Sequence, residues 1–343
     1  MVQPQRPWRG GRAQLQRQVS ILAISFVGAA ALVQFTGING KLGFAAGLLL
    51  IAVASSAVVE GYGRGIEAAK DGAARAVMFA AAVLVFIPLA SILYTVVANG
   101  LTALRGNFFT QDMRIASFDA DLAEGGALHA LVGTLQLIVI ATLLSLPIGI
   151  LTALYLTEIR GRFAPLVRFL VQAMSGVPSI VAGLFIYSAF ILHGGIGYSG
   201  LAGGLALAIL MLPTVARTAE EVLKLVPRDL REAGEALGAT QWRTVTGIVL
   251  PTARSGLVTA AILGIARVAG ETAPLVLTIF GSNSLTLNPV GEPIAALPLY
   301  IFQAMRAGLD VAISRAWTAA FVLMLFVLLL FSAARALSGR KIR

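Results

Sequence analysis

Two charged residues, Arg267 and Glu271, stand inside an otherwise apolar segment at about 254–280. Four residues apart in one continuous helix, they would lie on the same face. Charges at bilayer depth are costly and usually face a pathway or one another. A guanidinium suits bidentate binding of a phosphate-like oxyanion. The pair therefore predicts either an anion contact, with Glu271 tempering the arginine, or a structural ion pair within a helical bundle.

Arg217 is a weaker candidate for the same pathway, because it stands at the end of the preceding apolar segment and could equally set orientation. Other reactive chemistry is scarce. The chain has no Cys, which excludes a disulfide, a thiolate nucleophile and a Cys-ligated metal. Its only histidines, His129 and His193, lie at predicted segment ends. We therefore expect no catalytic residue, no metal and no cofactor, and an intramembrane enzyme is disfavoured.

The elements that must position these charges are membrane spans. The chain is 58% hydrophobic and 12% charged, with a mean hydropathy of +0.87. Soluble domains carry roughly 25% charged residues. Apolar stretches of bilayer length indicate an all-α polytopic membrane protein. The net charge of +10 then reflects basic loops on the cytoplasmic side of a membrane rather than nucleic-acid binding.

The apolar stretches predict eight spans, at about 19–37, 42–59, 74–98, 128–157, 165–193, 201–219, 254–280 and 312–334. The turn residues at 38–41 make the first two a helical hairpin. The Gly and Pro residues of SGVPSIVAGLF at 175–185 permit a break in the fifth span. The polar loops 99–127 and 281–311 are long enough to cover a pathway or to meet a partner.

The distribution of basic residues predicts the orientation of these spans. With the N-terminus inside, 20 of the 26 Lys and Arg residues fall in cytoplasmic segments and 5 in outer segments, leaving Arg267 in the membrane. Cytoplasmic loops of membrane proteins carry such an excess. Both termini and the segment 217–254 are therefore expected in the cytoplasm, and both long loops outside.

The charged segment 217–254 predicts two short helices joined by a glycine turn. Pro227 suits a helix start. Leu230, Ala233 and Leu237 share one face of the helix that follows, and Gly238 fits its C-terminal cap. A second short helix begins at Thr240 or Gln241 and ends near Ile248. From these residues alone, a partner site and an interfacial loop without a partner are equally acceptable.

A sequence pattern decides between these alternatives. The string EAGEALG at 232–238, followed by nine residues and IVLP at 248–251, resembles the EAA loop of bacterial ABC importer permeases, EAA-xxx-G-x9-I-x-LP. The matching residues are Glu232, Ala233, Gly238, Ile248, Leu250 and Pro251, while Gly234 replaces the second Ala. In that family the loop is a coupling helix that docks on the ATP-hydrolysing subunit. No G-x-x-x-x-G-K-[ST] string occurs, so the nucleotide site is expected on that partner.

Three further strings narrow the resemblance. ARVAGETAPL at 266–275, GVPSIVAGLF at 176–185 and ALPLYIF at 296–302 are similar to PstA-type permeases of phosphate ABC importers. The PstC-type sister subunit is less similar, because its GET is typically followed by Met-Ala rather than by Ala-Pro. The resemblance covers about 74–335 and implies a role for Arg267 and Glu271 in phosphate translocation. It does not extend to 1–73, so the N-terminal hairpin is an addition.

The resemblance implies a layout and a set of partners. We expect a cytoplasmic basic tail at 1–18, an added transmembrane hairpin and linker at 19–73, a six-span type I importer core at 74–335, and a second tail at 336–343. The expected partners are a PstC-like permease, two ATP-binding subunits, an extracytoplasmic phosphate-binding protein, phosphate and the lipid bilayer. The expected location is the bacterial inner membrane.

Two alternatives stay open from the sequence. The chain could be a permease subunit for another oxyanion, such as sulfate, molybdate or tungstate, since only the GETAP and GVPSIVAG contexts favour phosphate. It could also be a membrane sensor or scaffold without a transport role. That second alternative requires the EAA-like segment to be dispensable for ATPase binding and for uptake.

Overall fold

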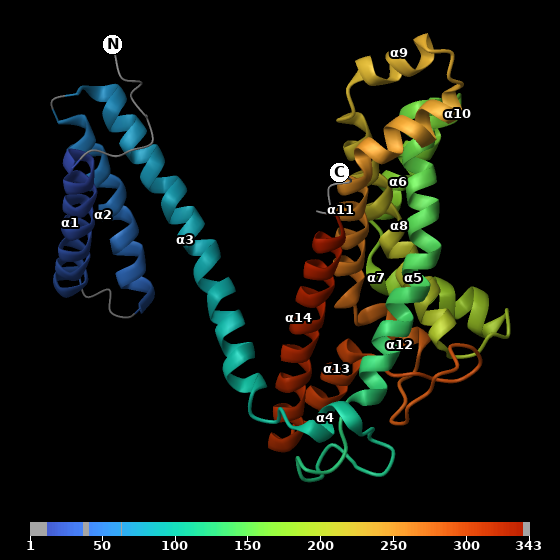
Figure 1. The fold of residues 1–343 in the computed structure, drawn as a ribbon. Helices are drawn as coiled ribbons and strands as arrows, with labels where there is room; N and C mark the ends of the chain where they lie inside the picture. Colours follow the sequence, from blue (N-terminus) through green and yellow to red (C-terminus); the bar gives the residue numbers. More distant parts are fainter. Residues whose placement is uncertain (1–11, 37–40, 63, 339–343) are drawn as a thin grey trace. The chain divides into compact units, whose positions relative to one another are not determined.

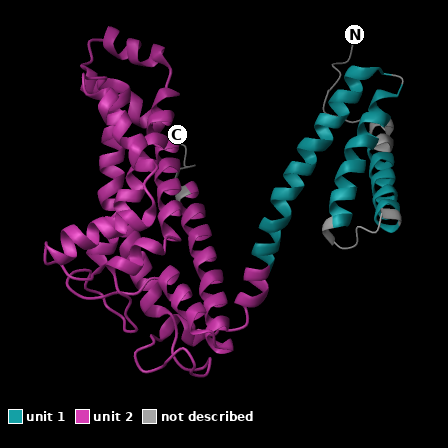
Figure 2. Ribbon diagram, turned by 180° about the vertical axis from the view of Figure 1, so that it is seen from behind, with its two compact units in different colours: residues 1–94 teal, residues 95–343 magenta. Residues whose placement is uncertain are grey.

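The computed structural model of the chain describes residues 12–36, 41–62 and 64–338, and within them it is helical apart from one isolated bridge between Phe280 and Ile294. The all-α prediction is thus confirmed for this part. The chain forms two compact units, residues 1–94 and 95–343 (Figure 2). Residues 38–40 of the predicted turn, most of the N-terminal tail and the last five residues fall outside the described ranges.

The first unit is built from α1 (Arg12–Thr36), α2 (Lys41–Gly61) and most of α3 (Ile66–Gly100). The predicted pairing of the first two helices is confirmed, since the hydroxyls of Ser25 and Ser55 meet at 3.0 Å between them. Near the C-terminal end of α2, the Glu60 carboxylate accepts hydrogen bonds from Arg64 and Arg75, each at 3.3 Å. Polar groups inside the unit are therefore paired, as burial requires.

The second unit contains the remaining helices. They are α4 (Gly106–Thr110), α5 (Leu128–Leu154), α6 (Ala164–Ser175), α7 (Ser179–Ile186), α8 (Gly200–Lys224), α9 (Arg228–Ala236), α10 (Gln241–Thr244), α11 (Leu250–Ala269), α12 (Ala273–Thr278), α13 (Leu297–Ala307) and α14 (Asp310–Ser338). Three π-helical turns are η1 (Tyr155–Ile159), η2 (Tyr187–Leu192) and η3 (Val245–Val249). Figure 1 shows α9 and α10 at one end of this unit, here called the α9 end, and the long loops around α4 and α12 at the other, the loop end.

The structure has six helices, among the described residues, that are long and apolar enough to cross a membrane. The expected fifth span is instead a broken pair, α6 and α7–η2, bent by 102° at Gly176–Pro178; counting it gives seven. Pro178 cannot donate a backbone hydrogen bond, so the helix breaks there, as the sequence permits. The described apolar run of α1, Gln18–Gln34, is shorter than a span, so the expected eight are not all confirmed.

The core of the second unit lies around α8, which packs along α5 and α11 (Figure 1). Its buried residues include Leu137, Leu207, Met211, Val215, Leu275 and Ile279. Close approach depends on glycine: a Cβ at Gly149 of α5 would lie 2.8 Å from Val215, and one at Gly264 of α11 would lie 2.7 Å from the same side chain. Small residues let helices approach in this way in membranes.

The long loop before α5 is held by a buried arginine. Arg315, in the second turn of α14, is only 2% exposed. Its Nη2 donates hydrogen bonds to the carbonyl oxygens of Ala120, Asp121 and Glu124 at 3.2, 2.7 and 2.7 Å. The carbonyls gain a buried cationic donor and the arginine is compensated by three dipoles. The loop 101–127 is therefore an ordered structure fixed to α14.

The same loop is joined to the second long loop. The N–H of Met113 donates to the carbonyl of Asn283 at 2.9 Å, and the N–H of Leu285 donates to the Asp112 carboxylate at 3.1 Å. Burial opposes ionisation of Asp112, but the hydrogen bonds from the Leu285 and Arg114 amides outweigh it and lower its pKa. Gln136 of α5 also donates to the carbonyls of Thr286 and Leu287. The two long loops thus form one connected surface at the loop end.

Replacing Arg315 by Met should destabilise this surface. The substitution leaves buried carbonyl oxygens without a donor, which costs on the order of 3 kcal/mol. We expect a lower midpoint of thermal unfolding for the purified chain in detergent, with increased amide exchange in 113–127. Arg114→Met is the matched control, since Arg114 is exposed, and it should leave both quantities unchanged. Equal midpoints for the two variants would contradict the anchoring role of Arg315.

Candidate coupling segment and translocation residues

Helix α9 presents its apolar side outward. The helix runs from Arg228 to Ala236, one residue after Pro227, close to where the sequence predicts it. Leu230, Ala233 and Leu237, the predicted apolar face, are all exposed, and Leu237 is 90% exposed. An amphipathic helix of a solitary soluble domain would bury this face. The arrangement leaves an apolar stripe at the end of the chain without a partner among the described residues.

Gly238 ends α9 with a left-handed residue. Its φ is +79°, a conformation that costs other residues free energy. The N–H of Ala239 donates to the carbonyl of Gly234 at 3.1 Å, and the N–H of Gly238 donates to that of Glu235 at 2.9 Å. These two bonds are the Schellman arrangement of a helix C-terminus. The predicted glycine cap is confirmed, and it explains the fixed glycine of the EAA-like pattern.

The second helix of the segment differs from the prediction. It starts at Gln241, with the Thr240 hydroxyl accepting the N–H of Arg243, but it does not end near Ile248. It continues through η3 into α11, so that 241–269 is one long helical span. Pro251 is tolerated because it follows the wider π turn and sits at the start of α11. The predicted stop was wrong because the proline begins a helix rather than ending one.

The residues of the EAA-like pattern occupy two sides of the segment. Glu232 and Ala233 are exposed on α9, and Pro251 is exposed at the start of α11. Ile248 is half-buried, and Leu250 packs against the core beneath α8. Gly234, which departs from the pattern, is buried: a Cβ there would lie 2.8 Å from Ile248 Cδ1. The glycine therefore permits close packing of α9 on η3.

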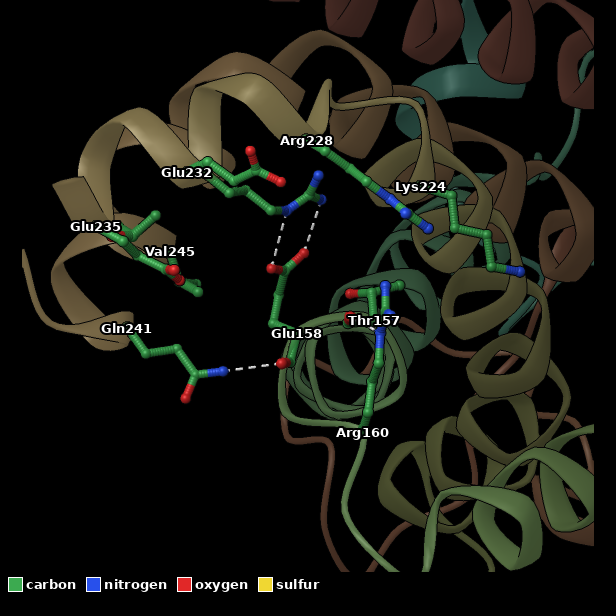
Figure 3. A pocket seen from close by; sticks show the side chains of 11 residues that line it. Thr157, Glu158, Arg160, Lys224, Arg228, Glu232, Glu235, Gln241 and Val245 are labelled. Atoms are coloured by element: carbon green, nitrogen blue, oxygen red, sulfur yellow. Dashed lines mark hydrogen bonds and ion pairs between the residues drawn. The ribbon is translucent and has the colours of Figure 1, made fainter.

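The inner side of α9 carries Arg231, which forms a fork with Glu158 of η1. Nε and Nη2 of Arg231 donate to the two carboxylate oxygens at 3.1 and 2.9 Å (Figure 3). The same guanidinium donates to the carbonyl oxygen of Leu223, in the last turn of α8, at 2.9 Å and to that of Val226, just beyond the helix, at 2.5 Å. The side chain of Glu158 is 8% exposed and that of Arg231 is 20% exposed. This is a partly buried, bidentate and fully hydrogen-bonded ion pair.

Glu158 also holds α10. The side-chain amide of Gln241 donates to the Glu158 carbonyl oxygen at 2.8 Å (Figure 3). A cleft of 620 Å³ lies between these groups; its charged lining residues are Glu158, Arg160, Lys224, Arg228, Arg231, Glu232 and Glu235. Both signs of charge line the cleft, so it is not a dedicated anion site. Both short helices are thus tied to one residue at the end of the α5 span.

Further along α8, a buried carboxylate is shared by two cations. Glu220 accepts from Arg168 of α6 at 2.9 Å and lies 3.1 Å from Lys224 Nζ. Sequence reasoning missed these pairs and the Arg231–Glu158 fork. The sequence gives only weak evidence for these ion pairs. Glu158 begins a short turn in which the other charged residues are basic, and Glu220 stands just past the expected end of the sixth span. Glu158 is 73 residues from Arg231 along the chain, and Glu220 is 52 residues from Arg168.

The structure changes the expected relation of Arg267 and Glu271. Helix α11 ends at Ala269, so Glu271 lies in the break before α12 and does not share a helix face with Arg267. The break follows from Pro274, which in a continuous helix would clash with the carbonyl of Gly270. Arg267 is exposed and Glu271 is half-buried, and within the described residues their side chains form no ion pair with each other. The structural ion pair is therefore not what this conformation contains.

Arg217 is on α8 itself, and that helix runs five residues beyond the expected span end. Its side chain is exposed. Along α8 it lies about 10 Å from the α9 end, whereas Arg267 lies about 24 Å beyond Pro251 on α11, taking about 1.5 Å per helical residue. The two arginines are thus at different depths.

The three strings singled out in the sequence come together around the break after α11. Gly183 of α7 faces Pro274, and a Cβ on Gly183 would lie 2.6 Å from the Pro274 Cα. The third string, 296–302, contributes Ala296 and Leu299 to the same core. The N–H of Leu297, in the same string, donates to the Thr134 hydroxyl of α5 at 2.8 Å. Packing of α7 against α12 therefore requires a glycine at 183, in the second string, because Pro274 of the first string lies against it.

Comparison with known proteins identifies the fold and the family. The profile of the family described as "Binding-protein-dependent transport system inner membrane component" matches residues 145–343. The phosphate transport system permease protein PstA 1 of Mycobacterium tuberculosis H37Rv is 40% identical over 260 residues, covering 75% of this chain and 84% of the relative. The chain belongs to the PstA family of permeases. The resemblance drawn from the motifs is confirmed.

Other PstA relatives agree. PstA of Haemophilus influenzae is 41% identical over 244 residues, covering 70% of this chain and 83% of the relative. Among solved structures, a chain of the inward-facing MetNI methionine ABC transporter matches with a TM-score of 0.51 and 22% identity, covering 64% of this chain and 95% of that one. At this identity the match shows a shared ABC permease fold.

Substituting Gly238 by Ala should loosen the coupling segment. An alanine held at positive φ costs about 1 kcal/mol, so the Schellman bonds should open more often. We expect faster amide hydrogen exchange at Gly234–Thr240, with little change in α5 or α8. Gly247→Ala is the control, because a Cβ at Gly247 meets no atom within 4 Å and its φ is ordinary. Identical exchange in both variants would show that the cap does not hold α9.

Proposed function

We propose that the chain is a permease subunit of an ATP-driven inorganic phosphate importer in a bacterial inner membrane. The observation that supports phosphate as the substrate is the sequence identity of about 40% with proteins named phosphate transport system permeases. These relatives are transport proteins, so the chain is a transport subunit rather than an enzyme. Hydrolysis of ATP belongs to partner subunits.

The outward apolar stripe of α9 supports docking on an ATPase subunit. Leu230, Ala233 and Leu237 are exposed together, and Trp242 of the adjoining helix is 68% exposed. A cluster of this kind favours a protein partner, which would bury the apolar side chains. The EAA-like residues Glu232, Gly238, Ile248 and Pro251 lie in the same segment. We assign them, with Ala233 and Leu250, to ATPase coupling.

Arg267 is our main candidate for contact with phosphate in the pathway. It is exposed on a span of an isolated permease chain, and a charge at that position is costly against lipid. The non-helical residues Gly270–Thr272 follow directly, and broken backbone at membrane depth is tolerated where it is buried or lines a water-filled cavity. Glu271, in this break, would modulate the arginine. Arg217 is the weaker member of the set.

We further propose the assembly and orientation. A PstC-like permease would complete the pathway, two ATP-binding subunits would occupy the α9 end, and an extracytoplasmic phosphate-binding protein would meet the connected loops 101–127 and 280–296. Counting α1 and the broken α6–α7 pair as spans gives eight, with both termini in the cytoplasm, consistent with the basic-residue distribution. In the core, ATP-driven closure of the ATPase pair moves α9 and alternates access to the pathway.

Arg267→Gln should abolish ATP-dependent phosphate uptake while the complex still assembles. The glutamine amide carries no positive charge, so the substitution removes the charge-assisted hydrogen bonds that the guanidinium would donate to the anion. Uptake is measured in vesicles that contain the chain and its partner subunits, and assembly by co-purification. Arg335→Gln, an exposed arginine near the end of α14, is the control and should transport normally. Uptake near the wild-type rate in Arg267→Gln would remove Arg267 from the pathway.

The remaining alternatives are tested in the same vesicles. If the chain carries another oxyanion, unlabelled sulfate, molybdate or tungstate should compete with labelled phosphate. If it is a sensor or scaffold, deletion of 232–238 should leave ATPase binding and uptake intact. Our proposal predicts no competition by those anions and loss of both ATPase binding and uptake on deletion.

A further inference from the structure

The Arg231–Glu158 fork joins the coupling segment to two spans at once. Through Glu158, Arg231 is bound to η1, which continues α5, by bonds of 2.9 and 3.1 Å. Through its bonds to the Leu223 and Val226 carbonyls it is bound to the end of α8. The Leu223 carbonyl belongs to the last turn of α8 and the Val226 carbonyl follows it, and a cation is favourable at a helix C-terminus. One side chain of α9 therefore contacts both of the spans that pack most extensively together in the second unit.

The fork is separate from the outward face of α9. Arg231 lines the cleft and is bonded to Glu158, whereas Leu230, Ala233 and Leu237 are exposed. Gly234, one helical turn beyond Arg231, is also buried. The two sides of α9 thus differ: the outer side is apolar and could bind a partner, whereas the inner side is charged and is bonded to the rest of the chain.

The other contacts between α9 and the spans are weaker candidates for transmitting force. Gly234 offers only packing on Ile248 and Thr244. The nearby pair of Lys224 and Glu221 is exposed and lies within α8, so it does not involve α9 at all. A bidentate pair with little exposure resists both stretching and rotation, since two parallel bonds fix the planes of both groups.

We propose that Arg231 and Glu158 are a positioning pair that transmits displacement of α9 to α5 and α8, and thereby couples ATP hydrolysis to substrate movement. This inference rests on the proposed function as a permease subunit. It assigns no contact of either residue with substrate or with the ATPase. Gln241 contributes by holding α10 to the backbone of the same glutamate.

Glu158→Gln is the main variant. It keeps the size of the side chain and leaves Arg231 bonded to the α8 carbonyls, but it removes the charge and one accepting oxygen of the fork. In vesicles with the full importer, we expect phosphate transported per ATP hydrolysed to fall by roughly five- to tenfold. ATPase binding and ATP hydrolysis should persist. Glu221→Gln is the matched control on an exposed pair and should keep the wild-type ratio.

Arg231→Lys and a double variant separate coupling from stability. Lys keeps the charge but cannot form the fork, so it should lower the same ratio. Glu158→Gln combined with Arg231→Lys should be no worse than the more severe single change if the residues act through each other. A purely structural role would instead reduce uptake and hydrolysis together and leave their ratio unchanged, and that result would overturn the inference.

A second readout does not require phosphate to be the substrate. The chain has no cysteine, so Leu135→Cys gives a single site for a fluorophore on an exposed position of α5, roughly 35 Å along the helix from Glu158. In the assembled importer, ATP should change the fluorescence in the otherwise wild-type chain, and Glu158→Gln should abolish that change. Failure of phosphate uptake alone would overturn the proposed substrate. An ATP response that survives in Glu158→Gln would overturn the role of the fork.

Discussion

A bilayer offers backbone groups no hydrogen-bond partners, and this constraint governs the whole chain. Residues in the apolar segments are driven into helices because helices satisfy their own backbone. Each interruption therefore needs a local reason. Pro178 breaks the fifth apolar segment, and Pro274 separates α11 from α12. Gly183 then lets α7 pack on Pro274. The helices that follow the two breaks thus pack together, and the second break comes shortly after Arg267, where we propose contact with phosphate.

At the α9 end, polar contacts hold the helix in place. Here a short helix is held by polar bonds on its inner side and leaves its apolar residues outward. Gly238 ends it with two hydrogen bonds, and Arg231 ties it to two spans. An element held in this way moves with its neighbours when a partner displaces it. In the coupling that we propose, displacement of α9 reaches the spans through a few polar contacts, while the wide helix interfaces keep the core intact.

Much of this could be predicted from the sequence, because it depends on local chemistry. The apolar periods predict the helices, Gly238 predicts a positive φ, and the spacing to Pro251 predicts the coupling segment. The continuation of the helix through Ile248 could not be predicted, since it depends on a π turn fixed by packing. Glu158 and Arg231 are far apart in sequence, and Arg315 binds backbone carbonyls that carry no sequence signal. Arg267 and Glu271 do not share a helix face as predicted, because Pro274 interrupts the helix in the turn that contains Glu271.

We propose that this chain helps to move phosphate at the expense of ATP. The decisive measurement is uptake of labelled phosphate into vesicles containing the chain, a PstC-like permease, the ATPase subunits and the binding protein. We expect uptake that requires both ATP and this chain and that is not reduced by excess sulfate. Equal phosphate accumulation with and without this chain would contradict it.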